Sequence, residues 1–217
     1  MNKIMFNDKY GLTQAVLEGR KTQTRRMLNP TIFFQRLETY EGWSNEDISA
    51  WKRSCNRQLY EAQGDMLQQM LDYALSSSRY KGGEEVAVAQ AYSEFVSEAG
   101  FNEAEINKLR ISKGWTNKMF VKADLMPNRI RITDIRAERL QEISDEDCIA
   151  EGIREQYFYS GEEEPEFEGY SYYAKNVLKP LFCTPREAYA ALIDKISGKG
   201  TWASNPYVFV YEFELIK

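Results

Sequence analysis

The sequence predicts a mixed α+β protein in which short strands and amphipathic helices alternate along the chain. Residues 129–136 alternate isoleucine with polar or charged residues, a pattern typical of a strand with one buried and one wet face. Residues 184–196 begin with Thr-Pro-Arg-Glu, which places a hydroxyl at the N-cap and proline at the first helical position. A chain of 217 residues, 43% hydrophobic and 28% charged, is long enough to bury a core around such elements.

The N-terminal part of the chain is expected to form a strand at 3–6, a helix at 9–18 and a second strand at 21–27. The helix has apolar residues at helical spacing, and Gly19 is suited to end it. Strict alternation along the second strand would then divide its polar side chains between two faces. One face would carry Lys21, Gln23 and Arg25, and the other Thr22, Thr24 and Arg26.

The middle of the chain begins with a helical pattern from residue 46 to 77, with a break expected near Gly64. Its apolar residues recur near a 3.6-residue period, although several glutamines leave the segment fairly polar. The Gly82-Gly83 pair signals a turn. After this turn we expect a strand at 85–91, a helix at 103–111 and a strand at 118–122.

The C-terminal half contains a second capped helix and an unusual acidic segment. Ser144 and the three acids after it predict a helix start, and Gly152 predicts its end. Glu151 then falls in the last turn, where a carboxylate faces the negative end of the helix dipole, so it is a candidate functional residue. Residues 154–180 are acidic and aromatic, and they form either a lid that stacks on a base or a loop that orders on packing. Residues 207–213 predict a central strand.

Several kinds of chemistry are excluded by composition. The chain contains no histidine, which removes histidine bases, Ser-His-Asp triads and HExxH zinc sites. Its cysteines, Cys55, Cys148 and Cys183, are widely spaced and form no C-x-x-C pair, so we expect reduced structural thiols and no metal site. A net charge of −5 weighs against a broad grip on duplex nucleic acid, although it allows a small basic pocket. No long apolar run or signal peptide is seen, so we expect a cytoplasmic protein without a membrane partner.

The most distinctive stretch is Gly-Arg-Lys-Thr-Gln-Thr-Arg-Arg at residues 19–26. It places Arg20, Lys21, Arg25 and Arg26, together with two threonines, in one short segment of an acidic protein. Cations after a helix also complement its dipole by a few tenths of a kcal/mol, roughly, which is a purely structural explanation. Two cations would be enough for that purpose, so the four favour an anion or nucleotide site.

These residues resemble a family signature. Gly19-x-Lys21-x-x-Thr24-x-Arg26 is similar to the G-x-K-x-x-E-x-R motif of the ASCH family in the PUA-like superfamily. Thr24 replaces the usual glutamate, as it does in small bacterial members that look like amidohydrolases. The likeness is greatest to longer ASCH-like proteins of phages and prophages. Further segments that fit the family are 4–6, 83–88, 126–130, 132–151 and 205–209.

The resemblance implies a fold and a domain organisation. It predicts one PUA-like (ASCH) β-barrel domain over residues 1–217, with flanking helices and two insertions. One insertion is helical, at 44–80, and either packs on the barrel or provides a surface for a protein partner. The other is the acidic aromatic loop at 154–182.

The resemblance also implies a site without cofactor or metal. Position by position, the family's catalytic lysine, threonine and glutamate correspond to Lys21, Thr24 and Glu151. A lysine in a partly apolar pocket can lose its proton near neutral pH and activate a hydroxyl or water. Because strand alternation separates Lys21 from Thr24, such a site requires a turn or bulge between them. The implied activity is hydrolysis of an N4-acylated cytidine.

The residues at 19–26 are also compatible with other functions. The same segment could belong to a non-catalytic module that binds RNA or a modified nucleoside, or, with less support from the net charge, to a ribonuclease. A phage accessory protein with a protein partner is a further alternative. In the binding module, cations would contact phosphate and aromatic rings would stack on a base. The candidates for these contacts are Arg20, Arg25, Arg26, Arg129, Tyr92 and Trp202.

Overall fold

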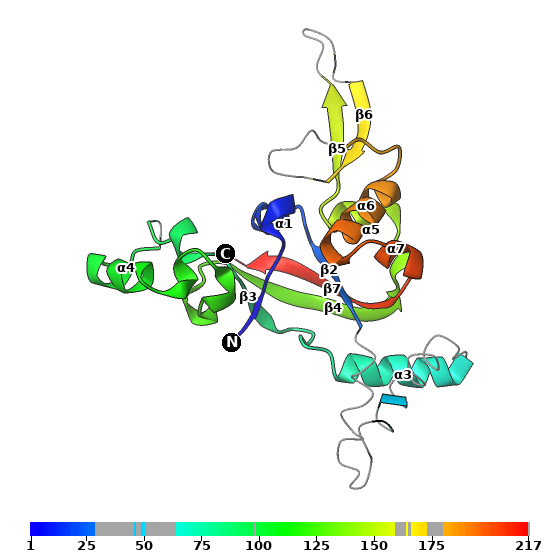
Figure 1. Cartoon of the computed structure of the whole chain (residues 1–217), viewed down its shortest axis with the longest axis horizontal. Coiled ribbons are helices and arrows are strands. Elements are labelled where there is room, and N and C mark those ends of the chain that lie inside the picture. Colours follow the sequence, from blue (N-terminus) through cyan, green and yellow to red (C-terminus); the bar gives the residue numbers. More distant parts are fainter. Residues whose placement is uncertain are drawn as a thin grey trace.

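A five-stranded sheet lies at the centre of the computed structural model, which describes residues 1–28, 46, 49–50, 64–97, 99–158, 164, 166–172 and 180–216. The strand order is β1-β3-β4-β7-β2, with β1 parallel to β3 and the other neighbours antiparallel (Figure 1). The two longest strands, β4 and β7, pair along most of their length. The strands are β1 (Asn2–Ile4), β2 (Gln23–Met27), β3 (Glu85–Val88), β4 (Arg129–Arg139) and β7 (Tyr207–Ile216).

The sheet confirms the mixed α+β class but differs from the expected barrel. Closing a barrel requires the two edge strands to hydrogen-bond to each other, whereas β1 and β2 form the two edges and do not pair. The described strands therefore form an open sheet. Strand β7 is flanked by β4 and β2, which confirms that the C-terminal strand is internal. Its buried residues include Val208 and Val210, both with no exposed surface.

Helices α1, α5, α6 and α7 lie on one side of the β4–β7 ribbon in Figure 1, while α3 lies beyond its other side. The helices pack against the sheet and form the main hydrophobic core with it. This core includes Ile130 and Ile132 from β4 and Leu192 from α6. The 3-10 turn η1 (Asp8–Tyr10) joins β1 to α1, and η7 (Leu140–Glu142) joins β4 to α5. A further 3-10 turn, η3 (Tyr92–Glu94), follows β3. The helices are α1 (Leu12–Leu17), α3 (Gly64–Ser76), α5 (Asp145–Ala150), α6 (Pro185–Ser197) and α7 (Thr201–Ser204).

The capping signals located α5 and α6 correctly. The Ser144 hydroxyl accepts a hydrogen bond from the Asp147 backbone N–H at 3.1 Å, and α5 begins between them. Thr184 caps α6 through the Glu187 N–H at 3.2 Å, with Pro185 as the first helical residue. These hydrogen bonds join residues that are close in sequence, so the sequence pattern was sufficient to locate the start of each helix.

A smaller core lies at the other end of the sheet, around α4 (Glu103–Arg110) and Tyr92. The strand expected at 118–122 is wrong, because Lys118–Phe120 form the 3-10 turn η5. The Asn117 side chain accepts a hydrogen bond from the Met119 N–H at 2.9 Å, which starts a turn instead of an extended segment. Two further 3-10 turns, η4 (Lys113–Trp115) and η6 (Ala123–Leu125), complete this region.

The segments expected to be insertions are described in part. Helix α3 begins at Gly64, the position of the expected break, while most of 44–63 lies outside the described residues. Residues 154–182 are not a loop throughout, because β5 (Arg154–Phe158) pairs antiparallel with β6 (Glu166–Ser171). Tyr157 and Phe167 pack edge to face across this pair, with ring centroids 5.7 Å apart, and such cross-strand aromatic pairs favour a hairpin. Within the described part of the chain, no helix has the length and apolar character needed to cross a membrane.

Candidate functional site

The end of α1 places Lys21 in the structure. Gly19 adopts a left-handed conformation, with φ of 73°, and its N–H donates to the Val16 carbonyl at 2.9 Å. The N–H groups of Arg20 and Lys21 both donate to the Ala15 carbonyl, at 2.9 and 3.0 Å. This glycine-terminated turn satisfies the last carbonyls of the helix and holds Lys21 outside the following strand, which begins at Gln23.

The end of α5 is built in the same way and faces the first turn. Gly152 has φ of 108°, and its N–H donates to the Ile149 carbonyl at 2.8 Å. A Cβ atom on Gly152 would lie 3.8 Å from Lys21 Cδ, so the lysine stem packs directly on this glycine. The backbone N–H of Thr22 also donates to the Ala150 carbonyl, at 2.9 Å. The two turns are therefore hydrogen-bonded to each other and bring Lys21 beside Glu151.

Lys21 and Glu151 form a buried ion pair. Lys21 Nζ donates to Glu151 Oε2 at 2.5 Å and to the Glu151 backbone carbonyl at 2.8 Å. Only 1% of the lysine side chain and 6% of the glutamate side chain are exposed. Burial lowers the pKa of Lys21 below its ordinary value, and the negative charge of Glu151 offsets part of that change. The ammonium group also compensates the carboxylate that is unfavourably placed at the end of α5.

Arg25 lies at the centre of a network of carboxylates. Its side chain has no exposed surface, and its guanidinium contacts Glu138 Oε1 at 2.7 Å, Asp147 Oδ2 at 2.6 Å and Glu151 Oε1 at 3.4 Å. Arg25 also donates to the Gln23 side chain at 3.2 Å. Burial opposes its charge, but the neighbouring carboxylates raise the pKa of Arg25 above its ordinary value. Arg25 is thus neutralised by the protein itself, and it fixes the second oxygen of Glu151.

Arg136 from β4 extends the same network. It pairs with Asp147 at 3.0 Å, with Glu138 at 3.1 Å and with Glu212. Burial alone would raise the pKa of Asp147, but hydrogen bonds from Arg25 and Gln23 outweigh it and lower this pKa. Arg136 therefore joins the cluster around Arg25.

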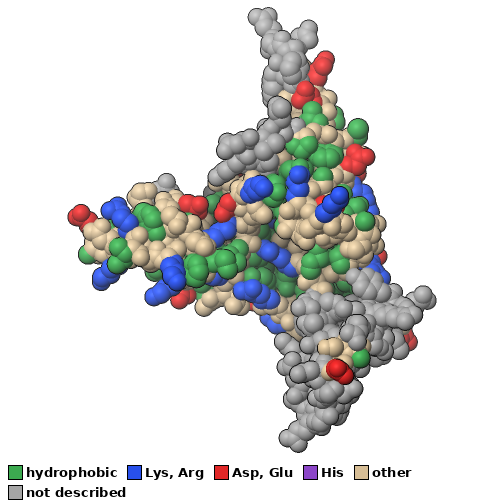
Figure 2. Space-filling model, viewed as in Figure 1, with side chains coloured by type: hydrophobic (Ala, Val, Ile, Leu, Met, Phe, Trp, Pro, Cys, Tyr) green, Lys and Arg blue, Asp and Glu red, His purple; other side chains and the backbone are tan. Residues whose placement is uncertain are grey.

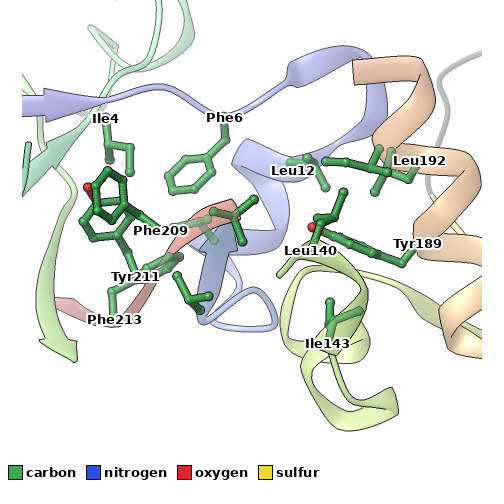
Figure 3. Packing of buried hydrophobic residues seen from close by; sticks show 14 of the residues in the cluster. Ile4, Phe6, Leu12, Leu140, Ile143, Tyr189, Leu192, Phe209, Tyr211 and Phe213 are labelled. Atoms are coloured by element: carbon green, nitrogen blue, oxygen red, sulfur yellow. The ribbon is translucent and has the colours of Figure 1, made fainter. Parts of the chain in front are cut away.

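A cavity of about 230 Å³ lies against the Lys21–Glu151 pair. Thr24 lines the same cavity, because the strand begins only at Gln23 and alternation does not apply to Lys21. One wall comes from α6 and another from Phe6, whose ring lies 5.9 Å from Lys21 Nζ. Figure 3 shows Phe6, Leu12, Tyr189 and Leu192, four of the lining residues, at the junction of the N-terminal segment, α1 and α6.

The structure thus brings together five of the residues singled out from the sequence. Lys21, Thr24, Glu151, Arg25 and Arg26 all line the cavity. Arg26 is exposed, donates to the Met5 carbonyl at 2.5 Å and lies over the Phe6 ring at 5.8 Å.

Four other predicted binding residues do not line this cavity. Arg20 pairs with Glu18 at 2.5 Å, and Arg129 lies on the sheet near Glu85, at 3.8 Å. Tyr92 is 2% exposed, so its ring has no open face for a base, and its hydroxyl accepts the Lys122 N–H at 2.8 Å. Trp202 packs against Tyr189, with ring centroids 6.2 Å apart, and has Arg186 at 5.2 Å from its ring.

Sequence reasoning missed several parts of the site. Glu138 and Asp147, which anchor Arg25, come from β4 and α5 and are far from it in sequence. Phe6 was seen only as a strand residue, and Tyr189 matches the apolar face of α6, so neither carries a local signal. Cys148 is buried beside the network, and burial raises the pKa of its thiol to about 12, which fits an inert structural cysteine.

The carboxylates of the site are held by cations. Across the residues that the structure describes, no group of three or more histidine, cysteine, aspartate or glutamate side chains is arranged to hold a metal ion. The arrangement can bind a small polar ligand and can transfer a proton through Lys21. In comparisons with known proteins, no family model, curated protein or solved structure matches this chain significantly.

Proposed function

We propose that the cavity is the active site of an amidohydrolase that removes the acyl group from an N4-acylated cytidine or a similar modified nucleoside. One observation carries this proposal. A lysine with a lowered pKa lies with its carboxylate partner and a threonine hydroxyl on the wall of one cavity. A base, a nucleophile and a group that orients the base are the parts that acyl transfer requires in a protein without histidine.

The size of the cavity favours a small substrate. Its volume of about 230 Å³ is below the roughly 300–1,000 Å³ that is typical of sites for drug-sized ligands. It suits an acylated base, with the sugar toward the opening, better than a folded or double-stranded nucleic acid. The lining is mostly apolar, from residues such as Leu192 and Ile193, which would exclude water and favour the neutral amine of Lys21.

Hydrolysis would begin with a proton transfer to Lys21. A neutral lysine amine has two N–H donors and one lone pair, and the two hydrogen bonds to Glu151 use both donors. The lone pair can then accept the proton of the Thr24 hydroxyl while Thr24 Oγ1 bonds to the acyl carbon. The carbonyl π electrons move to the carbonyl oxygen, which gives a tetrahedral intermediate.

The intermediate would collapse by breaking the C–N bond. The proton held by Lys21 passes to the leaving nitrogen, so cytidine departs as a neutral amine and the acyl group remains as an ester on Thr24. Water then attacks the ester carbonyl and gives a proton to Lys21. The C–O bond to Thr24 Oγ1 breaks, this oxygen takes the proton back from Lys21, and the carboxylic acid leaves with Thr24 and the neutral amine restored. Glu151 stabilises the ammonium form of Lys21 in both steps, and Arg25 fixes the orientation of Glu151 from the other side.

We also propose a fold and a family for this chain. We infer a PUA-like architecture of the ASCH type, as in phage and prophage proteins, with the five-stranded sheet as its core. The support is local: the G-x-K-x-x-T-x-R motif lies at a helix–strand junction, where the glycine ends α1 and the arginine reaches the cavity.

The activity can be tested by mass spectrometry of a panel of modified nucleosides that includes N4-acetylcytidine. Wild-type protein and Arg129→Ala should release cytidine, because Arg129 lies outside the cavity. Lys21→Met should release none, and circular dichroism would confirm that this variant is folded. Equal turnover by Lys21→Met would contradict the mechanism, and no turnover of any nucleoside by the wild type would remove the proposal.

A non-catalytic binding module is the second candidate, and one observation favours it. Lys21 Nζ also donates to the backbone carbonyl of Glu151, so the lysine has a structural use at the end of α5. Figure 2 shows Lys and Arg side chains over the part of this face near α1 and α6, with hydrophobic side chains between them. This candidate predicts salt-sensitive binding of nucleosides or single-stranded RNA that Arg26→Ala weakens, with no product formed.

A further inference from the structure

Tyr189 carries an unused hydrogen-bonding group beside the catalytic pair. It comes from the middle of α6 and is 2% exposed. Figure 3 shows its ring projecting away from the helix, past Leu140, with the oxygen at the far end. The hydroxyl is buried and has no hydrogen-bond partner among the described residues. A buried hydroxyl without a hydrogen bond destabilises a fold. We therefore expect this hydroxyl to find a hydrogen-bond partner in another protonation state of the site.

The charges around this hydroxyl indicate what it can bind. Burial and then the nearby Glu151 raise the pKa of Tyr189 well above its ordinary value, so the hydroxyl keeps its proton and remains a donor. Among the charged neighbours, Glu151 has the largest effect. Tyr189 also lines the cavity together with Lys21 and Glu151. The charged or titratable groups with the largest effects on the pKa of Tyr189 are Glu151, Arg25, Cys148 and Glu138. Those with the largest effects on the pKa of Lys21 are Glu151, Arg26 and Arg25.

We propose that Tyr189 is a positioning residue whose hydroxyl donates a hydrogen bond to the Glu151 carboxylate when Lys21 is neutral. In the ion-paired state Lys21 Nζ compensates this carboxylate at 2.5 Å. Once Lys21 loses its charge, Glu151 would remain a buried anion with Arg25 at 3.4 Å. A hydrogen bond from the Tyr189 hydroxyl, which lines the same cavity, would then replace part of the stabilisation that the lost charge gave. Tyr189 would thereby favour the base form of Lys21. This role adds a positioning residue to the proposed hydrolase mechanism and rests on that mechanism.

A double-mutant cycle tests the contact without any substrate. Lys21→Met removes the positive charge that compensates Glu151, and Tyr189→Phe removes only the hydroxyl. In the wild-type background Tyr189→Phe should leave the unfolding midpoint unchanged or raise it, because the hydroxyl has no partner to lose. In the Lys21→Met background it should lower the midpoint by roughly 2–4 °C or more, the effect of about one hydrogen bond in a protein of this size. Equal shifts in both backgrounds would overturn the inference.

Two controls keep the cycle informative. The Tyr80 hydroxyl donates to the Lys3 carbonyl at 3.0 Å, so Tyr80→Phe should lower the midpoint similarly in both backgrounds. If Lys21→Met does not fold, Lys21→Gln takes its place in the cycle.

Kinetic measurements with N4-acetylcytidine distinguish a positioning role of Tyr189 from a purely structural one. Tyr189→Phe should lower kcat roughly ten- to hundred-fold, the effect of a hydrogen bond to a charged group, while KM changes little. The rise of the rate with pH should also move to higher pH, since the neutral form of Lys21 is less favoured. An unchanged kcat and pH profile would overturn the inference. If the wild type turns over no nucleoside, the proposed function is lost, while the cycle still decides whether Tyr189 binds Glu151.

Discussion

Arg25 connects three carboxylates, from β4, from α5 and from the residue that follows α5, and its replacement by methionine should destabilise the fold strongly. Methionine keeps most of the apolar stem but leaves Glu138, Asp147 and Glu151 without their shared cation. Removing one partner of a buried ion pair typically costs about 3–5 kcal/mol. Glu138 and Asp147 are 15% and 21% exposed, so water compensates part of this loss. We therefore expect a loss of about 3 kcal/mol, a large part of the roughly 5–15 kcal/mol that stabilises a typical protein.

Urea unfolding of wild type and Arg25→Met at pH 7 measures this loss directly. Arg131→Met is the matched control, because Arg131 is 45% exposed and pairs with Glu85 and Glu214 on the surface of the sheet. Exposed pairs contribute about 0–1 kcal/mol, so this variant should stay near the wild type. If Arg25→Met lost no more stability than Arg131→Met, the reasoning about the buried network would be refuted.

The loss should also depend on pH. In the folded wild type the pKa of Asp147 is lowered, so this group contributes stability above its unfolded pKa of about 3.9, and that contribution disappears as the pH falls through the folded pKa. Without Arg25 the carboxylates are buried with less compensation and are more readily protonated. The difference between wild type and Arg25→Met should therefore shrink between pH 7 and pH 3. A constant difference across this range would contradict the assignment of the effect to charge.

Three further predictions concern single positions. Gly152→Ala should lose about 1–3 kcal/mol in urea unfolding, because φ is 108° and the new Cβ would lie 3.3 Å from Leu12 Cδ2; wild-type stability would contradict the tight packing of this turn. Thr184→Ala should lose about 1 kcal/mol in thermal unfolding by removing the N-cap of α6, and no change would argue against that cap. Cys183 is exposed and should react with a thiol reagent in the native protein, whereas Cys148 should react only after unfolding, as peptide mapping can show; rapid native labelling of Cys148 would refute its burial.

The parts of the fold that depend on neighbouring residues were predictable from the sequence. The cap at Thr184 and the glycine ends at Gly19 and Gly152 rely on hydrogen bonds within a few residues, and each was located correctly. The strand expected at 118–122 failed because Asn117 starts a turn with its own side chain, which apolar patterning does not show.

The candidate site was predictable only in part, for a related reason. The motif and the odd placement of Glu151 at a helix end pointed to Lys21 and Glu151, but strand alternation wrongly separated Lys21 from Thr24. The glycine turn delays the start of the strand and removes that conflict. The partners of Arg25 and the unpaired hydroxyl of Tyr189 depend on elements that meet only in the folded chain, so no local pattern predicts them.

Titration of Lys21 itself would show whether this side chain can act as a base. Selective isotope labelling of lysine and NMR detection can follow the protonation of its ammonium group in the whole protein, with Lys21→Gln assigning the signal. We predict a midpoint below the ordinary lysine value of about 10.4, because burial outweighs the charge of Glu151. A midpoint at or above that value would identify a purely structural ion pair and contradict the role of Lys21 as a base.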